Sequence, residues 1–172
     1  FREDFDDNSA GWQLTAGASI SDGSLVLRDA VIQVPGVVLD GDFSAEITFY
    51  VPQLPADFGL IVGDLDANRA HYLVASAVNL LDFRPEISDR TNNDFRILGQ
   101  GNVFQYDIDV VEPGPVTLRV EAAGDSYTLE LSQGQEANTR DVTVTFSRRG
   151  DYLYIVSEGQ FQIRIDSVTV TP

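Results

Sequence analysis

Hydrophobic and polar residues alternate one by one over short runs of this chain. Between Asp42 and Val51 the apolar side chains occupy every second position and mainly polar side chains lie between them. Successive side chains of a β-strand point to opposite faces of its sheet, so this alternation predicts a half-buried strand. Shorter runs predict further strands at Ser24–Arg28, Phe58–Gly63, His71–Ala77, Leu80–Arg84, Phe95–Leu98 and Phe104–Val110.

Two pairs of alternating runs are each separated by turn residues. The run Val116–Glu121 is followed by a turn at Ala123–Ser126 and then by Tyr127–Leu131, which predicts a β-hairpin. The run Val142–Phe146 is followed by turn residues and by a second run that includes Leu153–Ile155. This spacing predicts another hairpin.

The last apolar run changes phase. The positions Phe161, Ile163 and Ile165 share one phase, whereas Val168 and Val170 have the opposite one. A one-residue change of phase within a strand is typical of a β-bulge, and bulges often redirect a side chain near a site. We therefore expect a bulge at Asp166 and Ser167.

These patterns together predict an all-β protein. Strands follow each other with turn residues at short intervals, and no helical periodicity exceeds about two turns. Without helices to cover them, amphipathic sheets bury their apolar faces against each other. The sequence predicts an antiparallel two-sheet β-sandwich, or jelly roll, in a single domain covering residues 1–172.

Composition narrows the possible partners. The 172 residues include 27 acidic and 11 basic ones, so the net charge is −16. Like-charge repulsion argues against nucleic acid and anionic lipid surfaces. No apolar run is long enough for a membrane span, there is no cysteine, and neither an initiator methionine nor a signal-peptide pattern is present. We expect a piece of a longer extracellular or cell-surface protein.

The kind of charge is also informative. All 11 basic residues are arginine, and Asp outnumbers Glu by 19 to 8. Asp favours turns and caps and is a ligand for hard cations, whereas Glu and Lys favour helix surfaces. The charge composition therefore agrees with a sheet protein and leaves a cation site open.

Several segments resemble a known family. They are Glu3–Trp12, Ser21–Leu25, Gly41–Glu46, Phe58–Gly63 followed by His71–Val74, and Ile163–Val170. In order and spacing they resemble concanavalin A-like (laminin-G-like) jelly-roll domains of secreted bacterial proteins. One departure is Ser132-Gln133-Gly134-Gln135, where many members have an Asn-Gly turn. The family includes lectins, carbohydrate-binding modules, glucanases and adhesion domains, so the fold alone does not decide the function.

The resemblance implies a structural calcium ion where the first and last strands meet, near Glu3, Asp4, Asp6 and Asp166. The residues suit this role, because calcium takes six to eight oxygen ligands and Asp4 and Asp6 project to the same side of an extended segment. The alternative is that these carboxylates are solvated edge residues and turn caps.

Aromatic and planar polar residues are the candidates for glycan contact. Sugar faces stack on aromatic rings, and charged planar groups pair with hydroxyl groups. Arg69, His71 and Tyr72 are candidates for a groove rim, although His71 also fits an ordinary surface histidine. The tyrosines out of phase with the apolar residues beside them, which are Tyr50, Tyr106, Tyr152 and Tyr154, also suit such contact, and of these Tyr106, Tyr152 and Tyr154 are the further candidates. We expect Trp12 to fill the core.

We expect a non-catalytic extracellular domain that binds a glycan or cell-surface polymer. The Glu-x-Asp-x-(x)-Glu strand signature of laminarinase-like glucanases is absent, and the sole histidine has no Gly-x-Ser-x-Gly partner motif. One alternative is a structural or adhesive subunit that binds other copies of itself through sheet edges and faces. A weaker alternative is a glycoside hydrolase whose carboxylates are not identifiable.

Overall fold

The computed structural model describes residues 1–51, 56–65, 69–77, 81–91, 94–97, 104–106, 114–124, 126–143, 151–159 and 161–172. Within these ranges all regular structure is β, and no helix has the length and apolar character needed to cross a membrane. The strands are β1 (Arg2–Glu3), β2 (Ala18–Ser21), β3 (Ser24–Leu27), β4 (Ala30–Gln33), β5 (Phe43–Val51), β6 (Ala56–Asp64), β7 (Arg69–Ala77), β8 (Leu81–Thr91), β9 (Asp94–Ile97), β10 (Phe104–Tyr106), β11 (Gly114–Ala123), β12 (Ser126–Gln133), β13 (Glu136–Thr143), β14 (Tyr152–Glu158) and β15 (Ile163–Thr171).

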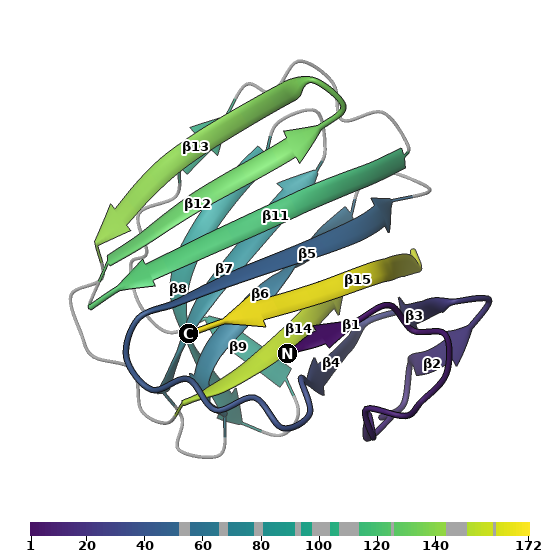
Figure 1. Ribbon diagram of the computed structural model, residues 1–172. Helices are drawn as coiled ribbons and strands as arrows, with labels where there is room; N and C mark the ends of the chain where they lie inside the picture. The colour runs from purple at the N-terminus through teal and green to yellow at the C-terminus, as the bar shows by residue number, and fades with distance from the viewer. Residues whose placement is uncertain are drawn as a thin grey trace.

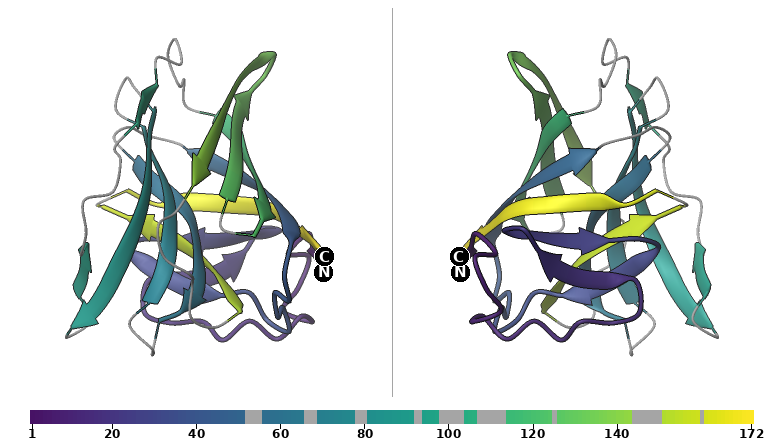
Figure 2. Two further views of the ribbon diagram at one scale, coloured as in Figure 1. Left: turned by 90° about the vertical axis from the view of Figure 1, so that its left-hand side faces the viewer. Right: turned by 90° about the vertical axis from the view of Figure 1, so that its right-hand side faces the viewer.

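The strands form two antiparallel sheets, as the alternation predicts. An eight-stranded sheet has the order β13-β12-β11-β5-β15-β3-β2, with β1 paired to β15. A seven-stranded sheet has the order β10-β8-β7-β6-β14-β4, with β9 paired to β8. Figure 1 shows the first sheet in front of the second, and Figure 2 shows the two layers edge-on. The fold is a β-sandwich.

The core lies between the two sheets. Every second residue of β5, from Phe43 to Val51, is buried there. The facing sheet contributes alternate residues of β6 and β14, including Leu60 and Ile155. Trp12 is only 3% exposed and packs against Phe5, so the expectation that it fills the core is confirmed.

The predicted bulge in the last strand is confirmed. The register between β15 and β5 shifts between Ile165 and Ser167. Because of this shift, Ile163 and Ile165 before the bulge and Val168 and Val170 after it all reach the same core. The extra residue, Asp166, is half-buried beside the bulge.

One predicted hairpin is correct and the other is wrong. Strands β11 and β12 pair directly, with Leu118 opposite Leu131. Strand β13, however, pairs with β12 in the eight-stranded sheet, whereas β14 lies between β6 and β4 in the other sheet. The chain therefore changes sheets between β13 and β14. Alternation identifies a strand and its buried face, but it carries no information about the partner.

The first and last strands meet, as the family resemblance implies. Arg2 pairs with Thr169 and Glu3 with Val168. The Phe1 ammonium donates a hydrogen bond to the Val170 carbonyl at 2.9 Å. The two ends of the chain lie side by side in Figures 1 and 2.

Candidate functional site

The outer face of the seven-stranded sheet carries two of the predicted tyrosines. In β14, Leu153 and Ile155 point into the core between the sheets. The intervening side chains therefore project to the opposite face, where Tyr152 is 38% exposed and Tyr154 is half-buried. The expectation that both tyrosines project away from the main core is confirmed.

Small and apolar residues surround these tyrosines. Tyr152 lies opposite Gly63, so the neighbouring position on β6 has no side chain that could cover its ring. Tyr154 lies opposite Ile61 and packs against a second apolar cluster made of Ile61, Leu65, Ala70 and Val156. The described side chains beside the two tyrosines include no carboxylate, whereas the register places Asp57 of β6 opposite Glu158 of β14 on the same face, and the side chains of these two residues lie outside the described part of the structure. The arrangement is an apolar floor with tyrosines at its surface.

A polar hollow adjoins the tyrosines at the edge strand β4. It has a volume of about 330 Å³ and is lined by Gly11, Gln13, Gln33, Pro35 and Gly36. Gln33 pairs with Tyr154 across β4 and β14, so both side chains lie on the same face. The Val34 amide donates to the Leu153 carbonyl at 2.8 Å, which continues the register and puts Pro35 opposite Tyr152. Two residues that line the hollow, Gln33 and Pro35, are therefore the cross-strand neighbours of Tyr154 and Tyr152.

The sequence did not identify this hollow. Gln33 lies between Ile32 and Val34 as an outward residue of a strand. Strand β4 has only four residues, which are too few to show the two-residue alternation of a strand clearly, so the sequence does not predict β4. Gln13 lies in a loop without periodicity. Only the folded chain brings the two amides to one hollow.

His71 corrects a prediction. Both interpretations of this residue placed it at the surface, yet it is 2% exposed and lies in the phase of Leu73, which faces the core between the sheets. Its Nδ1 is 2.5 Å from the Tyr127 hydroxyl of the other sheet. A buried imidazole needs such a partner, because an unsatisfied polar group in the core is costly. His71 joins the two sheets and lines no rim.

The other candidates for glycan contact are placed only by their backbone. Arg69 and Tyr72 belong to β7, where they pair with Asp64 and Ile61, and Tyr106 in β10 pairs with Leu81. The register puts position 72 in one cross-strand row with Tyr154 and Gln33. The side chains of these three residues lie outside the described part of the structure.

Glu3 has a role that the calcium prediction did not foresee. Its side chain is 9% exposed. One carboxylate oxygen accepts the backbone amides of Asp4 at 3.1 Å and Phe5 at 2.9 Å, and the other accepts the Trp12 indole N–H at 3.2 Å. Phe5 has a positive φ of 58°, a strained conformation for a non-glycine residue. The carboxylate thus holds the N-terminal segment around the Trp12 ring.

The remaining predicted calcium ligands have separate partners. Asp4 pairs with Arg2 at 3.2 Å. The Asp166 carboxylate accepts the Ser24 hydroxyl at 2.8 Å and lies 3.7 Å from the Arg164 guanidinium. Asp6 is exposed. Within the described residues, no three Asp, Glu or His side chains gather closely enough to hold a metal ion. The four residues therefore do not fit a calcium site as they are arranged, and calcium stays a prediction from the resemblance alone.

The N-terminal segment also shows the capping role of Asp residues. Asp7 accepts the Ser9 backbone amide at 2.7 Å. Hydrogen bonds from the Ser9 side chain and then from its backbone hold the pKa of Asp7 below its ordinary value, because they stabilise the ionised carboxylate. This acidic residue fixes a turn.

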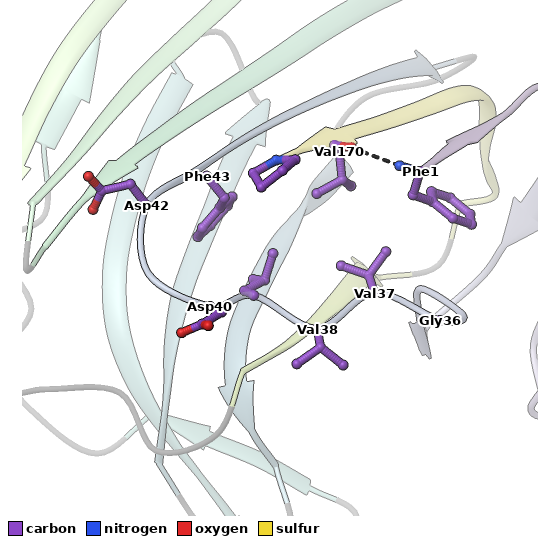
Figure 3. Close-up of a pocket in the computed structure, with 10 residues that line it drawn as sticks. Phe1, Gly36, Val37, Val38, Asp40, Asp42, Phe43 and Val170 are labelled. Atoms are coloured by element: carbon purple, nitrogen blue, oxygen red, sulfur yellow. Dashed lines mark hydrogen bonds between the residues drawn. The ribbon is translucent and has the colours of Figure 1, made fainter.

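A second hollow lies where the chain ends meet (Figure 3). It has a volume of about 180 Å³, with Phe1, Val37, Val38 and Val170 among its walls and Asp40 and Asp42 at one end. Val38 is 67% exposed and Phe1 is 39% exposed. Gly36 lines both this hollow and the one beside Tyr154, so the two hollows adjoin at this residue.

Known structures share this architecture. A β-glucanase from Bacillus licheniformis aligns with a TM-score of 0.65 at 10% identity, over 100% of this chain and 97% of its own. The carbohydrate-binding module CBM66 from Bacillus subtilis aligns with a TM-score of 0.54 at 19% identity, over 94% and 91% of the two chains. The chain shares its jelly-roll β-sandwich fold with these proteins.

This jelly roll also occurs as part of larger proteins. GH43B of the Bacteroides ovatus xyloglucan PUL aligns with a TM-score of 0.68 at 16% identity and covers 99% of this chain. The jelly roll spans 38% of the length of that protein. No protein-family model and no curated protein matches the sequence. At these sequence identities the similarity establishes the fold only. The function has to be inferred from the residues of the candidate site.

Proposed function

We propose that this chain is a non-catalytic, extracellular or cell-surface module that binds glycans on the outer face of its seven-stranded sheet. The observation that carries the proposal is the pair Tyr152 and Tyr154 on β14, which stand beside an apolar floor and a polar hollow. Similar folds in a carbohydrate-binding module and a glucanase support it.

The chemistry of this face suits a sugar ring. A pyranose or furanose ring has apolar C–H faces, which stack on aromatic rings, and hydroxyl groups at its edge, which need hydrogen-bonding partners. Tyr152 is 38% exposed and lies opposite Gly63, which has no side chain, so it offers a partly exposed ring. Gln33 offers both a donor and an acceptor next to Tyr154. The face therefore combines stacking and hydrogen bonding within one cross-strand neighbourhood.

The non-catalytic part of the proposal is supported by the absence of the laminarinase-like strand signature from the sequence and by the side chains that the structure describes directly beside the two tyrosines. Glycoside hydrolysis generally needs two carboxyl groups on either side of the scissile bond, about 5–9.5 Å apart. The described side chains beside Tyr152 and Tyr154 are apolar, aromatic or amide groups. We expect no release of reducing ends from any polysaccharide that the protein binds. If the protein releases reducing ends and this activity is lost when either tyrosine is replaced, the protein is a hydrolase.

Affinity gel electrophoresis on a polysaccharide panel tests the binding. We expect retardation by at least one glycan, and Tyr152→Ala and Tyr154→Ala should each weaken it about tenfold, which corresponds to about 1.4 kcal/mol. The matched control is Tyr50→Ala, because Tyr50 lies on the outer face of the other sheet under the Arg164 guanidinium. Equal loss in all three variants, or no retardation of the wild type, would refute the proposal.

Self-association is a second candidate function. The observation in its favour is the exposure of Val38 and Phe1 around the hollow at the chain ends. The net charge of −16 and the carboxylates of Asp40 and Asp42 oppose contact between two copies. Added salt screens this repulsion. Self-association through this hollow would therefore increase with ionic strength in light-scattering measurements and would be lost in Val38→Asp.

A further inference from the structure

We infer that the hollow beside Tyr154 is a subsite for a neutral sugar unit and that the module discriminates against glycans carrying carboxylate or sulfate groups. This inference rests on the proposed glycan-binding function and names the class of glycan. Its basis is the lining of the hollow, the position of two lining residues opposite the tyrosines, and the charge of the two segments that form the hollow.

The lining of the hollow contains hydrogen-bonding groups and no charge. Gln13 and Gln33 are both exposed, and each side-chain amide has one carbonyl acceptor and one NH2 donor. A sugar diol presents neighbouring hydroxyl groups that donate and accept, so an amide can pair with two of them at once. A carboxylate on the sugar would find only the NH2 donors and no cation.

The walls leave room for such a unit. The volume of about 330 Å³ is at the lower end of the range for small-molecule sites. Gly11 and Gly36 form part of the wall, and a Cβ atom at either position would meet no atom within 4 Å. The Pro35 ring adds an apolar surface opposite Tyr152. A sugar bound here therefore adjoins the face on which the next unit would stack.

The segments around the hollow are acidic. Residues 1–14 and 30–42 supply all of its lining residues. These two segments contain six acidic residues, Glu3, Asp4, Asp6, Asp7, Asp40 and Asp42, and one basic residue, Arg2. The whole chain has a net charge of −16. An anionic sugar would be repelled at distances up to a Debye length, about 8–10 Å, whereas a neutral sugar would not.

Affinity electrophoresis with two sets of polysaccharides tests the inference. The neutral set is hydroxyethyl cellulose, mixed-linkage β-glucan, xylan, mannan and fructan, and the anionic set is carboxymethyl cellulose, polygalacturonate and alginate. We expect binding in the neutral set only, with an affinity that does not change with ionic strength. Gln13→Ala and Gln33→Ala should each weaken it roughly three- to tenfold through the loss of sugar hydrogen bonds.

The matched control is Gln162→Ala, because Gln162 is also exposed but lies outside the hollow, just before β15. Thermal melting of each variant confirms that it is folded. Neutral binding that survives both glutamine replacements but is lost in Tyr152→Ala would overturn the subsite and leave the proposed function intact. Equal or tighter binding of the anionic set would overturn the charge discrimination alone. Absence of binding in both sets would overturn the proposed function and this inference together.

Discussion

The hydrogen bonds of Glu3 give the sharpest test of the N-terminal structure. The carboxylate accepts three N–H groups, from Asp4, Phe5 and Trp12, and is itself 9% exposed. Glu3→Gln keeps the shape of the side chain but replaces one acceptor oxygen with an NH2 group that only donates. Whichever way the amide is turned, the NH2 group faces either the backbone amides or the indole N–H. At least one donor loses its acceptor.

The expected loss of stability is large for a single isosteric change. A hydrogen bond to a charged group contributes about 1.5–3 kcal/mol, and a buried donor left unsatisfied costs about 1–3 kcal/mol. Since the two effects overlap, we expect Glu3→Gln to lower the free energy of unfolding by about 2–4 kcal/mol. For a chain of this size, the melting temperature should fall by roughly 5–15 °C.

The assay uses the only tryptophan of the chain. Trp12 is the residue that Glu3 holds, so its fluorescence reports on this segment without interference from another indole. Unfolding in urea is followed by Trp12 emission and by circular dichroism of the sheets. We expect both transitions to move to lower urea in Glu3→Gln, and the Trp12 emission of the folded variant to shift toward that of exposed tryptophan.

The control is Asp4→Asn. Asp4 is the neighbouring acidic residue, its side chain is 52% exposed, and it pairs only with the exposed Arg2 among the described residues. Exposed ion pairs contribute little, so we expect a change below about 0.5 kcal/mol. If Glu3→Gln and Asp4→Asn unfold within about 0.5 kcal/mol of each other, Glu3 does not hold the N-terminal segment in the way its contacts indicate.

Four further predictions concern the core, the Asp residues and calcium. Tyr127→Phe removes the hydroxyl group that pairs with the buried His71, so we expect a loss of about 1–3 kcal/mol in urea unfolding, and an unchanged stability would contradict the pairing. Ser157 is 1% exposed and its hydroxyl oxygen has no hydrogen-bonding partner among the described residues, so Ser157→Ala should raise stability by about 1 kcal/mol; a decrease would show that the hydroxyl is satisfied. The lowered pKa of Asp7 contributes stability that is present above its unfolded-state pKa and is lost as the pH falls through the folded-state value; an NMR titration midpoint should lie below that of an unfolded peptide and rise in Ser9→Ala. The calcium site implied by the resemblance predicts a higher melting temperature in calcium than in EDTA and the loss of this difference in Asp166→Ala, whereas equal melting temperatures would contradict the site.

The alternation of the sequence predicts faces well and partners poorly. The phase of β5 and the phase change at Asp166 are both visible in the sequence, because burial on one side of a sheet imposes a period of two residues. The separation of β13 from β14 is invisible, because both strands have the same local pattern. The choice of sheet depends on contacts between distant residues, which no short segment contains.

The polar residues of the core were predictable only in part. His71 shares the phase of Leu73, and Tyr127 shares the phase of Leu129. The alternation therefore places both side chains in the core, although their residue types are polar. Their pairing across the two sheets could not be predicted, since it depends on how the sheets face each other. The phase of a strand is a stronger guide to burial than the polarity of one side chain, provided that a partner exists.

The aspartates show why an acidic composition does not identify a metal site. Asp is both a ligand for hard cations and a residue of turns and caps, and counting it cannot separate the two roles. In the described part of the chain, Asp22 and Asp29 have positive φ angles in turns. Asp7 accepts a backbone amide two residues ahead, and Asp42 accepts the Gly124 amide at 2.9 Å from the neighbouring strand connection. These residues fix the turns that position the strands. Two of them, Asp7 and Asp42, belong to the segments that form the hollow, so the carboxylates that fix these loops also add to the negative charge that would repel an anionic glycan there.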